Sequence, residues 1–141
     1  MRIPGTVRAA LSTALLAGAV TSMASSIDLN QSAWTVTALP GQPALTEAAP
    51  TLRFADGRVS GSDGCNRYQG TYRSGADDFE VEPTLASTRM ACPEPVMHTA
   101  DAFIAALLQA RGARVAGDRL ELRSADGSLL LTATRSPPSA R

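Results

Sequence analysis

Apolar and polar residues alternate in short runs along most of the chain, as they do in β-strands that bury one face. The runs that predict strands are residues 33–39, 51–54, 58–61, 68–73, 79–82, 119–123 and 129–134. Asp56-Gly57 and Asp126-Gly127 separate neighbouring runs, and glycine tolerates the positive φ that tight hairpin turns require. The pattern therefore predicts about seven short antiparallel strands.

One segment has the spacing of a helix instead. Its apolar residues recur every three or four positions, which places them on one face. They are Val96, Met97, Ala100, Phe103, Ile104, Leu107 and Leu108. Prolines at 93 and 95 suit the first turn of a helix. Gly112 is expected to form a left-handed cap after the last turn. The pattern predicts a mainly β (α+β) fold, a small antiparallel β-barrel or strongly curved sheet of about seven strands with this one amphipathic helix covering a side.

The first 24 residues have the three-part pattern of a secretory signal peptide. Arg2 and Arg8 give a positive start, residues 9–20 are mostly apolar, and Ser22-Met23-Ala24 supplies the small residues of a cleavage site. The apolar run is shorter than the ~20 residues that span a bilayer, and no cysteine near the cleavage site could carry a lipid. We therefore expect residues 1–24 to be cleaved and the protein to be periplasmic or secreted, without stable membrane insertion.

The remaining chain is long enough for one domain with a modest core. Residues 25–32 are polar and are expected to form a flexible N-terminal segment. We expect the domain to occupy residues 33–134, with Trp34 as an inward anchor, and residues 135–141 to be a tail.

The charges are balanced, with 13 basic and 13 acidic residues. All the basic residues are arginines, and they are scattered singly. They form no basic stripe, so we expect no nucleic-acid partner. The chain has one histidine and contains no nucleophile elbow, zinc-protease motif or phosphate-binding glycine loop. We therefore expect a protein that is not an enzyme and has no cofactor or metal.

The chain contains two cysteines, Cys65 and Cys92. Two cysteines in an exported protein usually pair, and this disulfide would close a loop of about 28 residues worth roughly 3–4 kcal/mol. A metal site and a thiol-dependent enzyme, each using both cysteines and His98, are the alternatives. Zinc needs three or four protein ligands, and His98 lies four residues after Glu94 on the polar side of the predicted helix, where an exposed Glu–His pair is the simpler interpretation.

The residues around the two cysteines form paired motifs. The first is Gly64-Cys65-Asn66-Arg67-Tyr68, followed by Gly70 and Tyr72, and the second is Ser87-Thr88-Arg89-Met90-Ala91-Cys92. Together they resemble the two signatures of the META/HslJ-like domain family. Trp34, Phe54 and Asp126-Gly127 also fall where that family's pattern leads one to look, so the similarity covers about residues 33–134.

The resemblance implies an exported β-barrel-like domain, associated in bacterial relatives with heat shock and with envelope or antibiotic stress. The family has no agreed catalytic residues. Asn66, Arg67, Tyr68 and Arg89 are therefore candidates for either partner binding or structural support. Asn66 is a turn-former, Tyr68 and Tyr72 lie on one strand face, and Thr88 and Arg89 are placed to tie the second motif to the first.

The function we expect is that of a monomeric, non-catalytic protein that supports envelope or stress homeostasis by binding an unidentified envelope protein or small ligand. An alternative is a small-barrel carrier of an apolar ligand. Such a carrier needs an interior cavity of about 300 Å³ or more. The chain has only three phenylalanines, two tyrosines and one tryptophan, and its core must also accept the helix stripe, so we expect a filled interior.

Overall fold

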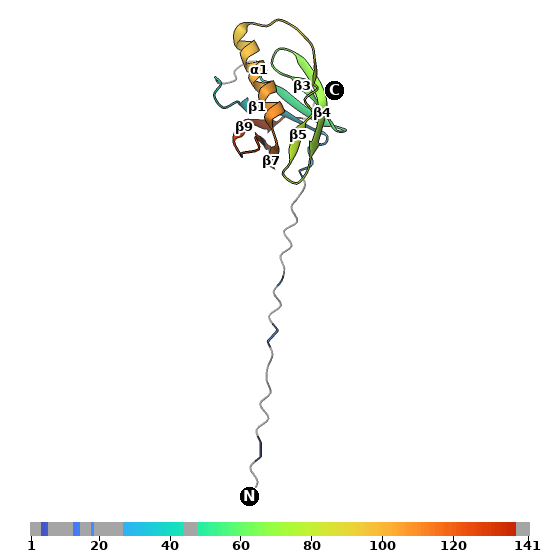
Figure 1. The fold of residues 1–141 in the computed structure, drawn as a ribbon, viewed down its shortest axis with the longest axis vertical. Coiled ribbons are helices and arrows are strands. Elements are labelled where there is room, and N and C mark those ends of the chain that lie inside the picture. The colour runs from blue at the N-terminus through green and yellow to red at the C-terminus, as the bar shows by residue number, and fades with distance from the viewer. Residues whose placement is uncertain (1–3, 6–12, 15–17, 19–26, 44–47, 138–141) are drawn as a thin grey trace.

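The computed structural model describes residues 4–5, 13–14, 18, 27–43 and 48–137, and it contains nine strands and one helix within them. The elements are β1 Ser32–Ala38, β2 Thr51–Ala55, β3 Arg58–Ser62, β4 Arg67–Ser74, β5 Phe79–Val81, β6 Ala86–Ser87, α1 Glu94–Gln109, β7 Gly112–Ala116, β8 Arg119–Arg123 and β9 Leu129–Arg135. The expected cleavage site after Ala24 lies outside the described residues. Figure 1 shows α1 packed along a strongly curved sheet.

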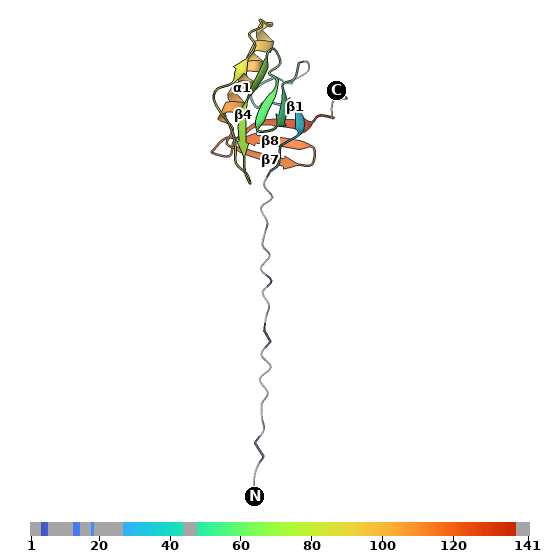
Figure 2. The same cartoon turned by 90° about the vertical axis from the view of Figure 1, so that its right-hand side faces the viewer.

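All the strand pairings are antiparallel, and the strands follow the order β5-β4-β3-β2-β1-β9-β8-β7. The short strand β6 pairs with β4 off this path. In Figure 2, β7 and β8 run across the molecule whereas β4 runs along it, as in a sheet that curls round on itself. The fold is therefore a nearly closed antiparallel barrel with one helix, which confirms the predicted mainly β architecture.

The two ends of the sheet meet where β5 approaches β7. Asp78 forms an isolated antiparallel bridge with Gly112. On either side of it, the Phe79 N–H donates to the Arg111 carbonyl at 3.0 Å and the Ala113 N–H donates to the Asp77 carbonyl at 3.1 Å. These bonds join the edges at one point only, so the barrel is closed by a short seam and not by a full ladder.

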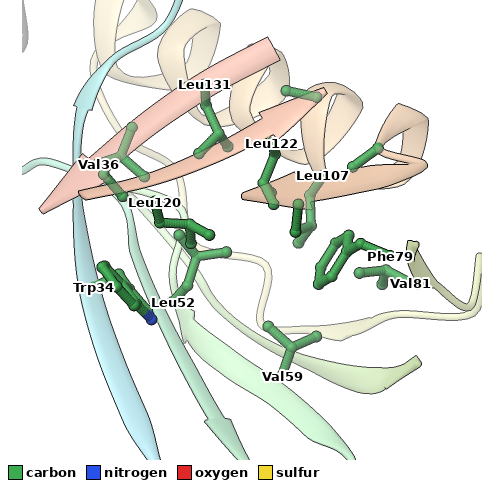
Figure 3. Close-up of a cluster of buried hydrophobic side chains, with 14 of the residues drawn as sticks. Trp34, Val36, Leu52, Val59, Phe79, Val81, Leu107, Leu120, Leu122 and Leu131 are labelled. Atoms are coloured by element: carbon green, nitrogen blue, oxygen red, sulfur yellow. The ribbon is translucent and has the colours of Figure 1, made fainter. Parts of the chain in front are cut away.

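The core lies between the curled sheet and α1, and side chains from both fill it (Figure 3). Phe103 and Leu107 of α1 are fully buried, as is the predicted anchor Trp34. The ring of Phe54 contacts Tyr72 and Phe79 edge-on, with centroid distances of 4.8 and 5.9 Å. The helix stripe is therefore core, as the sequence pattern indicates.

Both predicted Asp-Gly hairpins are present. Asp56 and Gly57 have φ values of 53° and 75° and join β2 to β3, and Gly127, at 88°, lies in the turn between β8 and β9. In the second turn, the Asp126 carboxylate accepts hydrogen bonds from the Ser128 N–H at 2.9 Å and from the Ser124 hydroxyl. Asp126 therefore holds its own hairpin closed.

Two strands were not predicted. β7 has only one fully buried side chain, Ala113, so its alternation is weak, although the Gly117-Asp118 pair that follows it is a recognisable turn signal. β6 has two residues, both exposed, and exists only because Ala86 and Ser87 pair with β4. β6 therefore depends on a partner that is distant in sequence, whereas β7 pairs with the neighbouring strand β8 across the Gly117-Asp118 turn.

The prediction that Gly112 caps the helix was wrong. α1 ends at Gln109, Ala110 is already extended at φ −62° and ψ 133°, and Gly112 is the first residue of β7. The Arg111 N–H donates to the Arg123 carbonyl at 2.8 Å, and Ala110 is completely buried. The chain is thus drawn directly from the helix into the sheet, which leaves no room for a left-handed cap.

The ends of the domain extend beyond the expected range of 33–134. Leu29 is buried, although residues 25–32 were expected to be flexible, and the Ile27 N–H donates to the Gly75 carbonyl at 3.2 Å. At the other end, the Arg135 guanidinium lies 4.4 Å from the centre of the Trp34 ring. Both departures reflect contacts with the barrel wall that local polarity does not reveal.

A methyl group at Gly61 should destabilise the fold. Gly61 has a φ of 154°, and a Cβ placed there would lie 2.3 Å from the Thr51 carbonyl oxygen. We expect Gly61→Ala to lower the free energy of unfolding by about 2–4 kcal/mol, measured by urea denaturation. Gly75→Ala is the matched control, because its Cβ would meet nothing nearer than 3.8 Å, and it should change stability by less than about 1 kcal/mol. Equal costs for the two variants would contradict this account.

The β8–β9 turn should weaken in acid. The Ser124 hydroxyl and the Ser128 N–H lower the pKa of Asp126 from 3.8 to about 2. A carboxyl whose pKa is depressed by folding contributes stability that is complete above its unfolded pKa and is lost as the pH falls through the folded value. The stability advantage of the wild type over Asp126→Asn should therefore shrink as the pH falls from about 4 to about 2. A carboxyl carbon NMR titration of Asp126 with its midpoint near 4 would refute the prediction.

Candidate functional site

A disulfide joins Cys65, in the turn between β3 and β4, to Cys92, just before α1. The S–S distance is 2.07 Å and the Cα atoms are 6.0 Å apart, which confirms the predicted pairing. The alternatives that use both thiols would require this bond to be broken. The His98 side chain is 75% exposed with Nε2 4.0 Å from Glu94 Oε1, and the described residues contain no cluster of three or more potential metal ligands.

The two joined segments, residues 63–67 and 88–92, form what we call the disulfide clasp. Its first half is a tight turn around the buried carboxylate of Asp63, which accepts the N–H groups of Cys65 at 2.8 Å and Asn66 at 2.6 Å. Gly64 has a φ of 105°, and a Cβ there would lie 2.8 Å from the Ala48 carbonyl. The turn therefore requires glycine at this position, and it orients Cys65 and Asn66 toward the second segment.

Asn66 connects the two halves of the clasp. Its side-chain oxygen accepts the Met90 N–H at 2.5 Å and the Thr88 hydroxyl at 3.0 Å, and its Nδ2 lies 3.5 Å from the Met90 carbonyl oxygen. Asparagine often forms turns because its side chain can bond its own backbone. Instead, the amide of Asn66 binds the peptide groups of Met90 across the gap, beside the disulfide.

Thr88 completes the connection. Its hydroxyl accepts the Arg67 N–H at 3.0 Å while donating to Asn66, and its own N–H donates to the Arg67 carbonyl at 3.0 Å. These bonds continue the β4–β6 pairing past its last strand residues. Thr88 therefore ties the two motifs together through Asn66 and the backbone of Arg67, as expected. Among the described residues the Arg89 side chain makes no such bond, so the expected tie through Arg89 was wrong.

Tyr68 anchors the clasp to the core. It is 3% exposed, its hydroxyl donates to the Thr51 carbonyl at 2.7 Å, and its ring lies 5.6 Å from that of Phe103. Burial, with a smaller effect of the Asp63 charge, raises the pKa of Tyr68 far above its ordinary value. Tyr68 is thus a neutral, fully engaged side chain in the wall of the barrel.

Arg67, Arg89 and Met90 form the exposed outer edge of the clasp, which we call the clasp rim. Met90 is 55% exposed and is the large hydrophobic residue left exposed in the described part of the chain. Within that part, the side chains of Arg67 and Arg89 make no hydrogen bond or ion pair, whereas Arg73 binds Glu80 at 3.0 Å. The rim therefore combines two unneutralised cations with one exposed apolar side chain.

A concave region of the surface was not predicted from the sequence. It is a surface groove of about 580 Å³ near the seam, lined by residues that include Arg73, Asp78, Glu80 and Arg111. Its arginines are already engaged, because Arg73 binds Glu80 and the Arg111 guanidinium donates to the carbonyls of Leu108 and Ala110 at 3.0 and 2.7 Å. Both guanidinium groups are therefore bound within the fold.

Across the described segments, no helix is both long enough and apolar enough to cross a membrane. The Cys65–Cys92 disulfide is consistent with an oxidising, extracytoplasmic compartment.

Comparison with known proteins gives a family and two similar structures. The META domain matches residues 27–137. An NMR structure of a protein from Burkholderia xenovorans has a TM-score of 0.62 and 28% sequence identity, covering 77% of this chain and 83% of that one. A second protein solved by NMR has a TM-score of 0.57 and 26% identity, covering 75% and 90% of the two chains. A search of curated proteins gives no match.

Removing the Asn66 amide should loosen the clasp even with the disulfide intact. Asn66→Ala leaves the Met90 N–H and the Thr88 hydroxyl without their acceptor, which should cost about 1–3 kcal/mol of unfolding free energy. The measurement is chemical denaturation under non-reducing conditions. Gln69→Ala, an exposed β4 position, is the control and should change stability by less than about 0.5 kcal/mol. Equal stability of the two variants would show that Asn66 contributes nothing to the clasp.

Proposed function

Because the chain belongs to the META domain family, we propose that it is an exported, non-catalytic binding protein that docks an envelope protein through the clasp rim. The observation that carries the proposal is the exposure of Arg67, Arg89 and Met90. The backbone that carries them is held by the disulfide and by the Asn66 side chain. The association of bacterial relatives with envelope stress motivates a role in envelope or stress homeostasis.

The rigidity of the clasp favours binding. A flexible loop loses conformational entropy when it docks, and preorganisation reduces that cost. Here the disulfide and the Asn66 amide hold the backbone of the second segment next to the Asp63 turn. The rim side chains can therefore meet a partner without first ordering the loop that carries them.

The chemistry of the rim indicates its partner. Arginine and methionine are enriched in protein interfaces, and arginine is common among the residues that dominate binding energy. Met90 would enter an apolar pocket, and carboxylates beside that pocket would pair with Arg67 and Arg89. Complementary charge would also speed association and exclude basic surfaces. An acidic, partly apolar protein surface is thus the partner that the rim fits best.

Export is supported by two independent observations. The first 24 residues have the signal-peptide pattern, and the cysteines are paired, as is usual outside the reducing cytosol. We place the mature protein in the periplasm or outside the cell.

The other hypotheses have less support. A thiol-dependent enzyme or a metal site would need Cys65 and Cys92 as thiolates, but their sulfur atoms are bonded to each other. A carrier of apolar ligands would need an interior cavity, whereas large side chains from the sheet and α1 share the interior as one cluster. Reactive thiols in unreduced, denatured protein would revive the thiol-dependent class.

The proposal predicts a position-specific contact in cells. A photo-crosslinking amino acid at position 89 should give a defined adduct in the envelope, because that side chain would lie against the partner. The same probe at the exposed positions 53 and 114, on β2 and β7, should not give this adduct. Added purified wild-type protein should suppress the adduct by competition.

Charge reversal provides the control for folding. Arg67→Glu with Arg89→Glu should compete at least about tenfold more weakly than the wild type, while Arg53→Glu with Arg114→Glu should compete normally. All variants should unfold within about 0.5 kcal/mol of the wild type, since these side chains are exposed. Equal competition by the two double variants would overturn the proposal.

A further inference from the structure

Met90 differs in its environment from the other sulfur atoms that would remain after cleavage at Ala24. The other three belong to Cys65, Cys92 and Met97. The two cysteines are already oxidised to a disulfide, and Met97 is half-buried on α1. Met90 is 55% exposed. It is therefore the sulfur that an oxidant arriving from solvent reaches most easily.

We propose that Met90 is a site of reversible oxidation, and that its conversion to the sulfoxide switches off docking through the clasp rim. The oxidant we consider is a peroxide, which converts a thioether to a sulfoxide. The oxidation of Met90 stands on its exposure alone. Its effect on docking rests on the function proposed above.

The reaction is a two-electron oxygen transfer. A lone pair on the Met90 thioether sulfur attacks one oxygen of hydrogen peroxide, a sulfur–oxygen bond forms and the O–O bond breaks. The sulfur becomes a sulfoxide, and the displaced hydroxide takes up the peroxide proton and leaves as water. The sulfur loses two electrons and the peroxide gains them, so no other reactant is needed. Reductases of methionine sulfoxide reverse the change with reducing equivalents from a thiol.

The clasp can accept this modification without unfolding. The backbone N–H of Met90 is bound to the Asn66 oxygen at 2.5 Å, and Cys92, two residues later, is held by the disulfide. These contacts involve the main chain and the neighbouring sulfur, and they leave the Met90 side chain toward solvent. An oxygen atom added to the Met90 side chain stays hydrated. On half-buried Met97, an added oxygen would have to fit against the residues that surround α1.

The modification acts on binding because it changes polarity. A thioether is flexible and apolar, and oxidation makes it polar and chiral. A sulfoxide forced into an apolar pocket loses hydrogen bonds to water that the pocket does not replace. Arg67 and Arg89 keep their charges, so oxidation removes the apolar contact and leaves the electrostatic attraction.

The first experiment tests oxidation without any partner. Purified, disulfide-bonded wild-type protein is treated with hydrogen peroxide, and peptide mass spectrometry locates the added oxygen over time. We expect Met90 to be oxidised at least about tenfold faster than Met97, with no change in the unfolding midpoint. Met90→Leu should remove the fast phase and Met97→Leu should keep it. Faster oxidation of Met97, or a fall in the unfolding midpoint on oxidation of Met90, would overturn the inference.

The second experiment tests the switch, using competition against the position-89 crosslink. Peroxide-treated wild type should compete at least about tenfold more weakly than untreated protein, and methionine sulfoxide reductase should restore it. Whatever the affinity of Met90→Leu, peroxide should leave it unchanged. Unaltered competition by protein carrying Met90 sulfoxide would overturn the switch and leave the proposed function intact. Absence of any position-specific adduct would instead refute the proposed function. The oxidation rates would still decide whether Met90 is the preferred site of oxidation.

Discussion

The structure depends on the connection between the β3–β4 turn and the chain that enters α1. The Cys65–Cys92 disulfide makes this connection covalent, and Asn66 reinforces it by binding the backbone of Met90. The helix follows immediately, so the connection determines where α1 begins relative to the sheet. Because Phe103 and Leu107 are fully buried, the starting point of α1 also decides which side chains fill the barrel.

The same connection compensates for an incomplete barrel. The two edges of the sheet meet only through a short seam at Asp78 and Gly112. A long ladder of hydrogen bonds, which would hold the edges together by itself, is not formed there. α1 packs against β5 and β9, from opposite sides of the seam, and its end leads directly into β7. Holding the start of the helix to β4 and its end to β7 therefore keeps the two edges of the sheet near each other.

The paired motifs divide into inner and outer residues. Asn66 and Tyr68 face inward, and their polar atoms bind Met90, Thr88 and Thr51 in the fold itself. Arg67 and Arg89 face outward with Met90. The two motifs thus build the clasp with one set of residues and leave the set between them exposed.

Elements that depend on neighbouring residues could be predicted from the sequence alone. Alternation located seven of the nine strands, the apolar stripe located α1, and the Asp-Gly pairs located two hairpins. Features that depend on distant partners arise from the tertiary structure, and they include β6, the burial of Leu29 and the path through Gly112 into β7. The tertiary structure also makes Asn66 bind across the clasp and leaves Met90 exposed, because side-chain surroundings arise only when separated segments meet.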